Sequence, residues 1–247
     1  MHKLMIHNIK KAFLYLDFAE YQLTFDDGLY SQYYYYPLLK NNFAPRIFFI
    51  ATGFIQPGKA RKTFDGRYIP YLKSREYMYE AFVKNNFEHF MRVEELKRLA
   101  DHNDVILGAH SHFHDIILTA HPLKKPLSRW KLEYMPSYCK TSDGSPMNRR
   151  SKLAYRGFSC EGEMLNRRSI SQWLAYVKHD TESCLLWFEK NLGFKPTAYC
   201  FPFNEYTPAL VEVLKEYGFT HFYNGRSGDD KQIFKRIDID SIAKSYN

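Results

Sequence analysis

Two acidic residues follow a short β-type run near the start of the chain. Tyr21 to Phe25 predicts a strand, and Asp26, Asp27 and Gly28 directly after it predict a turn. Parallel α/β folds carry their active residues at the carboxyl ends of strands. Because adjacent carboxylates repel each other, the pair favours a site where one binds a cation and the other acts as a base. The alternative is a surface turn without function.

Three histidines lie within five residues after another predicted strand, and the whole chain has only ten. They are His110, His112 and His114, and imidazole is the commonest side-chain metal ligand. His110 and His114 can converge on one ion if the segment turns helically, whereas His112 would point elsewhere. With a carboxylate from the first strand they make three protein ligands and leave room for water. That arrangement is typical of a catalytic metal site.

These candidate residues follow strands of a repeating β/α pattern. The predicted helices span 30–40, 88–101, 171–191 and 207–218, and the predicted strands span 21–25, 46–52, 105–109, 197–201, 221–223 and 234–239. The pattern indicates an α/β fold of six or seven repeats. That number is too small for a complete eight-fold barrel.

Two segments interrupt the pattern. Residues 56–86 combine scattered proline and glycine with charges and tyrosines, and we expect a surface insertion. Residues 122–169 contain 11 Lys or Arg against four Asp or Glu, and we expect long loops that decorate the domain. These basic loops are either a solvated face or a surface that binds an acidic glycan.

The composition fits one globular domain over residues 1–247. Hydrophobic residues make up 45% of the chain and charged residues 25%, which excludes a disordered or coiled-coil protein. The net charge of +8 allows an anionic partner. Because no nucleic-acid-reading motif is recognisable, we expect no nucleic acid to bind.

The cysteines and the apolar runs predict a cytoplasmic protein. The four cysteines lie at least 16 residues apart and form no CxxC pair, so we expect free thiols in a reducing compartment. The first 22 residues contain charges and no small-residue cleavage site, and we expect no leader. No run approaches the roughly 18 uninterrupted apolar residues of a membrane span.

Two of these segments resemble a known family. Leu23 to Gly28 and Gly108 to His114 resemble the first two motifs of the polysaccharide deacetylases, carbohydrate esterase family 4, which share the NodB homology domain. The resemblance implies a distorted or incomplete (β/α) barrel of about seven parallel strands, with 56–86 and 122–169 as insertions. It also implies that Asp26 is the catalytic base, and that Asp27, His110 and His114 hold one divalent metal, usually Zn²⁺.

The segment Cys200 to Tyr206 resembles the family's third motif. That motif forms one wall of the substrate groove and often supplies an oxyanion-binding backbone N–H, which implies that Pro202, Phe203 and Asn204 contact the substrate. It usually begins with an Arg that orients the base, and this Arg is missing here. We expect Arg236 to orient Asp26 instead.

The family's late Leu-x-His motif, the source of the general acid, is also absent. His112, His179 and His221 are the candidates for the missing acid, although each is more commonly a structural or surface histidine. The proton donor is therefore unassigned at this point.

The resemblance implies a metal-dependent hydrolase that removes the N-acetyl group of an amino sugar. With a cytoplasmic location, the expected substrate is a surface polysaccharide or its precursor, of the O-antigen or capsule type. The basic loops would suit an anionic glycan. Because two motifs depart from the family pattern, the alternative is a catalytically silent protein of the same fold that binds glycans.

Overall fold

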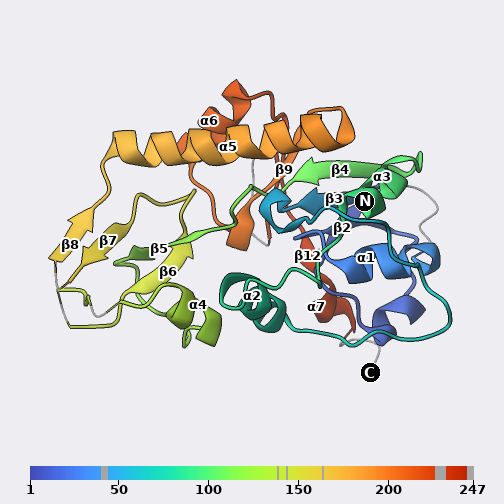
Figure 1. Cartoon of the computed structure of the whole chain (residues 1–247), viewed down its shortest axis with the longest axis horizontal. Helices are drawn as coiled ribbons and strands as arrows, with labels where there is room; N and C mark the ends of the chain where they lie inside the picture. Colours follow the sequence, from blue (N-terminus) through green and yellow to red (C-terminus); the bar gives the residue numbers. More distant parts are fainter. Residues whose placement is uncertain (40–43, 138, 143, 163, 226–231, 244–247) are drawn as a thin grey trace.

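A parallel sheet of eight strands forms the centre of the described part of the chain. The structure, a computed structural model, describes residues 1–39, 44–137, 139–142, 144–162, 164–225 and 232–243. Across the sheet the order is β11 (Ile233–Phe234), β10 (His221–Tyr223), β9 (Ala198–Cys200), β4 (Val105–Ala109), β3 (Arg46–Ile50), β2 (Tyr21–Phe25), β1 (His2–Ile6) and β12 (Ile237–Asp238). Every pairing is parallel (Figure 1). The sequence analysis did not predict β1.

The two edge strands of this sheet are neighbours in the sequence. Only Lys235 and Arg236 separate β11 from β12, although these strands stand at opposite ends of the order. Since an extended chain spans at most about 3.6 Å per residue, the two edges lie close together and the sheet curls. The result is an incomplete (β/α) barrel, which confirms the predicted fold class and brings Arg236 to the seam between the edges.

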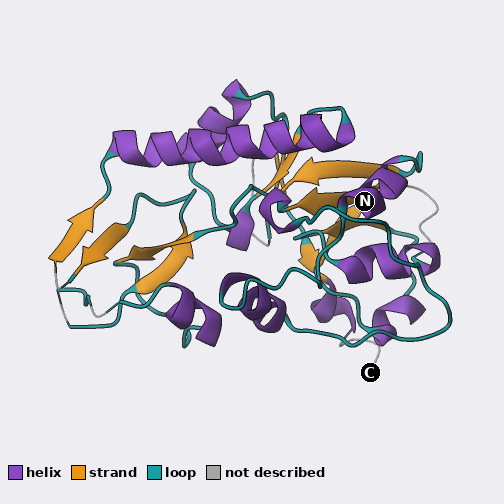
Figure 2. Ribbon diagram, viewed as in Figure 1, coloured by secondary structure: helices purple, strands orange, loops and turns teal. Residues whose placement is uncertain are grey.

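Four helices lie where they were predicted, namely α1 (Tyr30–Tyr35), α3 (Val93–Ala100), α5 (Ile170–Leu192) and α6 (Pro208–Glu216). The short α7 (Ile239–Ala243) was not predicted, and it begins at the last residue of the strand predicted over 234–239, which forms only the short β11 and β12. A 3-10 turn, Tyr36–Leu38, follows α1, and Lys40, the last residue of that predicted helix, lies outside the described residues. The long α5 begins at its Ser169 cap and runs past both sheets (Figure 2).

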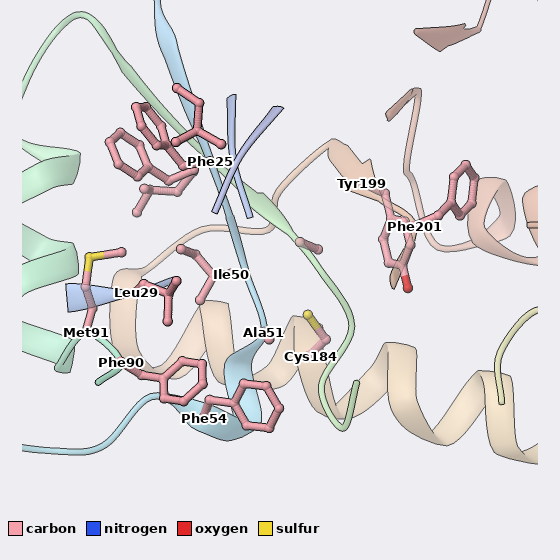
Figure 3. Close-up of a cluster of buried hydrophobic side chains, with 14 of the residues drawn as sticks. Phe25, Leu29, Ile50, Ala51, Phe54, Phe90, Met91, Cys184, Tyr199 and Phe201 are labelled. Atoms are coloured by element: carbon pink, nitrogen blue, oxygen red, sulfur yellow. The ribbon is translucent and has the colours of Figure 1, made fainter. Parts of the chain in front are cut away.

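Buried apolar side chains fix the strand ends that carry the candidate residues. Phe25, Ile50 and Phe201 are inaccessible to solvent and belong to one core cluster. Figure 3 shows them with Phe54 and with Cys184 of α5. Because Phe25 immediately precedes Asp26, its burial sets the point at which that carboxylate leaves the sheet.

The basic segment 122–169 is not a set of long loops, so that prediction is wrong. It forms α4 (Arg129–Tyr134) and three strands, which are β6 (Asn148–Ser151), β7 (Phe158–Glu161) and β8 (Met164–Arg167). They join β5 (Ile116–Thr119) in an antiparallel sheet of order β6-β5-β7-β8. These polar strands lack the apolar alternation by which a strand is recognised. Their pairing decides their conformation, since β6 and β7 pair with the fully buried β5 and β8 pairs with β7.

The segment 56–86 also holds more structure than a surface insertion, because it ends in α2 (Ser74–Phe82), which contacts α4. The N–H of Lys73 donates to Glu76 Oε2 at 2.7 Å and caps this helix. Upstream, Arg61 Nε donates to the buried Glu95 Oε1 at 2.8 Å. This ion pair attaches the irregular part of the segment to α3.

Two of the four cysteines form a disulfide, Cys139–Cys160, so the prediction of four free thiols is wrong. The bond links β7 to the chain before β6, and the 21-residue spacing gave no signal of it. Cys184 and Cys200 are free and buried. Within the described residues, no helix is long and apolar enough to cross a bilayer.

Candidate active site

Three loops at the carboxyl ends of β2, β4 and β9 meet at one cavity of about 280 Å³. Because the strands are parallel, these ends lie at the same edge of the sheet. The cavity is lined by Asp26, Asp27, His110, His114, Phe203 and Asn204, together with residues of α2 and α4. Of the predicted site residues, Pro202 is buried in the third loop and Arg236 lies behind Asp26. The structure therefore brings the three motifs together.

The backbone of these loops is strained. Six non-glycine residues of the described chain have positive φ angles, and five of them lie here, namely Asp27 (73°), Ser111 (72°), His114 (49°), Phe203 (60°) and Asn204 (55°). Each such conformation costs on the order of 1–3 kcal/mol and persists only where the surroundings hold it. Such strain is concentrated at functional sites.

Asp27, His110 and His114 form a buried cluster with the donors of a metal site. Asp27 Oδ1 lies 3.3 Å from His110 Nε2 and 3.4 Å from His114 Nε2. The three candidate ligand atoms all lie within 4.8 Å of one another. His110 Nδ1 lies 2.8 Å from the Cys200 carbonyl and donates to it, which leaves Nε2 free to act as a ligand. This donor set, two imidazoles and one carboxylate, fits a divalent metal such as zinc.

The surroundings keep His114 and Asp27 in the protonation states that a ligand needs. Burial would lower the pKa of His110, but its contacts with Cys200 and Asp27 raise that pKa well above the usual value, so His110 must release a proton when a metal binds. Burial lowers the pKa of His114 to about 3, so this imidazole is neutral. Burial opposes ionisation of Asp27, but hydrogen bonding to His110 holds the pKa of Asp27 below the usual range. Tyr77 of α2 donates its hydroxyl to Asp27 Oδ2 at 2.7 Å. The sequence gave no sign of this contact, because α2 itself was not predicted.

Asp26 forms a bidentate ion pair with Arg236. Nη1 donates to Oδ1 at 2.6 Å and Nη2 to Oδ2 at 2.8 Å, and both side chains are buried. Burial alone would raise the pKa of Asp26, but the charge of Arg236 outweighs it and lowers the pKa below the usual range. Asp26 is therefore ionised.

The small side chain of Cys200 leaves room for the guanidinium of Arg236. Arg236 Nη2 contacts Cys200 Sγ at 3.0 Å and Asn204 Oδ1 at 3.3 Å, and Nε donates to the Asn224 carbonyl at 2.8 Å. Cys200 stands where the resembling motif begins with Arg. The guanidinium of Arg236, from the barrel seam, thus reaches Asp26 from a position next to the small Cys200 thiol.

His7 lies beside Asp26, and sequence reasoning missed it. Its Nε2 is 3.8 Å from Asp26 Oδ2, its side chain is 33% exposed, and it lines the cavity. It follows β1 directly, as Asp26 follows β2. The available signal was therefore a polar residue after a short apolar run, Leu4 to Ile6, in a segment that was considered only as a leader.

The three histidines proposed as acids do not line this cavity. His112 Nδ1 lies 2.8 Å from Thr52 Oγ1. His179 is exposed and stacks on Phe113. His221 begins β10, so it stands at the opposite end of the parallel strands from the site.

A buried carboxylate on α5 holds the histidine loop. Asp180 accepts the backbone N–H of Phe113 at 2.9 Å, the N–H of His112 at 3.1 Å and the hydroxyl of Ser111 at 3.2 Å. The same hydroxyl accepts the His114 N–H at 2.8 Å. Burial raises the pKa of Asp180 to about 6. Ser111 therefore braces this loop, and Asp180 is a positioning residue that the helical pattern of α5 could not reveal.

A family model described as polysaccharide deacetylase matches residues 19–222. The chain belongs to the polysaccharide deacetylase family. This membership confirms the resemblance drawn from the first two motifs. His7 precedes the matched region and Arg236 follows it. Two side chains associated with the cavity thus lie on the segments that flank the region matched by the family model.

Solved structures of low sequence identity share the fold of this deacetylase. A de-N-acetylase from Aggregatibacter actinomycetemcomitans is 15% identical, with a TM-score of 0.58 over 92% of this chain and 74% of that one. IcaB from Ammonifex degensii is 15% identical, with a TM-score of 0.57 over 98% and 95%. The BpsB deacetylase domain from Bordetella bronchiseptica is 15% identical, with a TM-score of 0.55 over 88% and 72%. A search of curated proteins gave no match.

Proposed function

We propose that this deacetylase uses one divalent metal, zinc, to hydrolyse the N-acetyl group of an amino sugar in a surface polysaccharide or its precursor. The observation that carries the proposal is the convergence of Asp27, His110 and His114 beside an ionised Asp26. Asp27 Oδ and the Nε2 atoms of the two histidines would hold the metal. A bound Zn²⁺ acts as a Lewis acid on the acetyl carbonyl and lowers the pKa of a water.

Asp26 acts as the general base. Its carboxylate takes a proton from the water as the water oxygen bonds to the acetyl carbon. Arg236 keeps Asp26 ionised and fixes the direction of its oxygens. The negative charge that develops on the carbonyl oxygen needs a hydrogen-bond donor, and the backbone N–H groups of Phe203 and Asn204 are the two candidates. The N–H of Asn204 already donates to the Phe201 carbonyl at 3.0 Å, so we assign this role to the N–H of Phe203.

His7 supplies the proton that the leaving amine needs. When the carbon–nitrogen bond breaks, the nitrogen must be protonated to leave, and acetate and a free amino sugar result. The contact of His7 with Asp26 and its place on the cavity wall support this role. His112, His179 and His221 lack such a place, so we no longer propose them.

The surface glycan is proposed to be of the O-antigen or capsule type. The cytoplasmic location that led to this assignment stays a prediction, and the Cys139–Cys160 disulfide argues against it, because disulfides persist mainly in oxidising compartments. An N-acetylated surface glycan is compatible with either location.

Acetate release from a panel of N-acetylated oligosaccharides tests the proposal. We expect release by the wild type, loss of release after chelation, and recovery on addition of zinc. Asp26→Asn should reduce release by at least about 10³-fold while it retains the metal, since it removes the base and keeps the ligands. No release from any glycan by metal-loaded wild type would instead favour the catalytically silent, glycan-binding alternative.

A further inference from the structure

The walls of the cavity carry charges that the hydrolytic groups do not use. Asp26 and Asp27 are the only acidic residues among those that line it, and both face cationic or metal-binding partners. The two remaining full charges on the walls are positive. Arg75 comes from α2 and Lys131 comes from α4, so each of the two inserted segments contributes one.

Lys131 is a half-buried ammonium without a carboxylate within 4.0 Å among the described residues. Its Nζ donates to the Arg149 carbonyl at 3.0 Å, which uses one of its three N–H groups. The nearby Glu205 is engaged elsewhere, because it accepts from Arg150 Nε and from the Ser151 N–H, both at 2.8 Å. Burial lowers the pKa of Lys131. Partial burial of an ammonium costs free energy, and an anion that binds to it offsets part of this cost.

The position of Lys131 links it to the reacting group. Its Nζ lies 4.7 Å from the centre of the Phe203 ring, and that ring lies 4.5 Å from the ring of His114. The ammonium therefore sits one aromatic ring away from a candidate metal ligand. Arg75 is exposed in the first turn of α2, and no described carboxylate lies within 4.0 Å of it. Both side chains line the cavity that holds the candidate metal ligands.

We propose that Lys131 and Arg75 form an anion subsite, and that the deacetylase prefers glycans with a carboxylate or phosphate beside the N-acetylated sugar. This inference rests on the proposed function, whose substrate class it narrows. Lys131 has two further N–H groups that can donate to an anion, and the guanidinium of Arg75, which lines the same cavity, can donate to an anion as well. A purely structural role, in which Lys131 only ties α4 to β6, is the competing explanation.

The test compares kcat/KM for three N-acetylglucosamine substrates. They are neutral chitotetraose, an N-acetylheparosan tetrasaccharide with glucuronate carboxylates, and an oligomer joined through phosphodiesters. Lys131→Met removes the charge and keeps the stem over Phe203, whereas Lys131→Arg keeps the charge. Lys190→Met, an exposed lysine on α5, is the matched control. Arg75→Gln tests the second cation.

We expect the wild type to prefer at least one acidic substrate, with the preference falling by about 10- to 100-fold in Lys131→Met, mainly through KM. Arg75→Gln should cause a smaller fall, and Lys131→Arg and the control should retain the preference. The Lys190→Met control should retain wild-type activity on chitotetraose within about twofold, and the loss in Lys131→Met should be larger on the acidic substrates than on chitotetraose. The acidic substrate with the higher kcat/KM identifies the anion as a carboxylate or a phosphate.

Equal wild-type rates on neutral and acidic substrates would overturn the inference and leave the proposed function intact. An equal loss on all substrates in Lys131→Met would also overturn it, in favour of the structural role. If the wild type released no acetate at all, the proposed function would fail, and binding of the acidic tetrasaccharide by calorimetry would decide the subsite. Binding that Lys131→Met weakens would support it, and absence of binding would overturn it.

Discussion

The parallel barrel and the inserted segments contribute different parts of the same cavity. The barrel supplies the buried, strained loops with Asp26, Asp27, His110 and His114. The insertions supply the walls through α2 and α4, where Arg75 and Lys131 are more accessible. From this difference we expect the barrel to carry the hydrolytic chemistry and the insertions to choose the substrate. Loops positioned by a rigid scaffold commonly divide the work in this way.

Apart from changes to Asp26 and the candidate metal ligands, replacement of His7 should have the largest effect on turnover, because it removes the proposed proton donor from the barrel. We expect His7→Gln to lower kcat on an N-acetylated sugar by about 10² to 10⁴-fold. Hydrolysis of 4-nitrophenyl acetate should change little, since nitrophenolate leaves without a proton. His112→Gln serves as the control and should resemble the wild type. Equal losses on amide and ester would assign His7 a merely structural role.

The pair of Arg236 and Cys200 tests whether the barrel seam replaces the Arg of the third motif. Arg236→Met should lower kcat/KM by about 10- to 100-fold, because Asp26 loses its charged partner. It should also lower the free energy of unfolding by about 3–5 kcal/mol, since a buried carboxylate is left unpaired. Cys200→Arg combined with Arg236→Met should recover part of both losses. A double variant no better than Arg236→Met would contradict this exchange of positions.

Tyr77 is an exception to the division of roles between the barrel and the insertions. It belongs to the inserted α2, yet its hydroxyl orients Asp27. Tyr77→Phe should weaken zinc binding by about tenfold and leave activity at saturating zinc nearly unchanged. Competition with a chromogenic chelator measures the affinity, with Tyr79→Phe on the same helix as control. An unaltered affinity would show that α2 contributes walls alone.

The disulfide should have the smallest effect on turnover, because it lies within the insertion sheet. Cys139→Ser should lower the stability of that sheet by about 2–4 kcal/mol, as a cross-link over 21 residues is lost. Proteolysis of residues 122–169 should accelerate, while kcat on neutral chitotetraose should stay within about twofold. A large fall in kcat would mean that the insertion sheet supports the catalytic loops directly.

The sequence predicted the parts of the site that local patterns describe. Asp26, Asp27, His110 and His114 were recognisable because each motif follows a strand and keeps its spacing along the chain. No sequence pattern supported the predicted contact of Arg236 with Asp26, because this contact depends on how the two sheet edges meet. The same barrel closure determines the contact of His7, so no local signal indicated it.

The insertions were predicted less well for a physical reason. The strands of residues 122–169 carry Arg, Asn and Ser at positions where apolar alternation would have identified them, and their pairing with β5 or with each other determines their conformation. The short α2 has little apolar periodicity of its own and gains its stability from contacts with α4. Tertiary contacts therefore determine the conformation of both segments. The wall residues Tyr77 and Lys131 could not be assigned before those elements were known.

The metal content of the purified protein tests the central claim most directly, and it needs no substrate. Wild type, Asp27→Ala, His110→Ala and the control His221→Ala would be prepared identically and measured by mass spectrometry. We predict about one zinc or similar ion per chain in wild type and control, and loss of that ion in Asp27→Ala and His110→Ala. A wild-type site that stays empty after reloading, or an ion retained in both variants, would contradict the assignment of this cluster as the metal site.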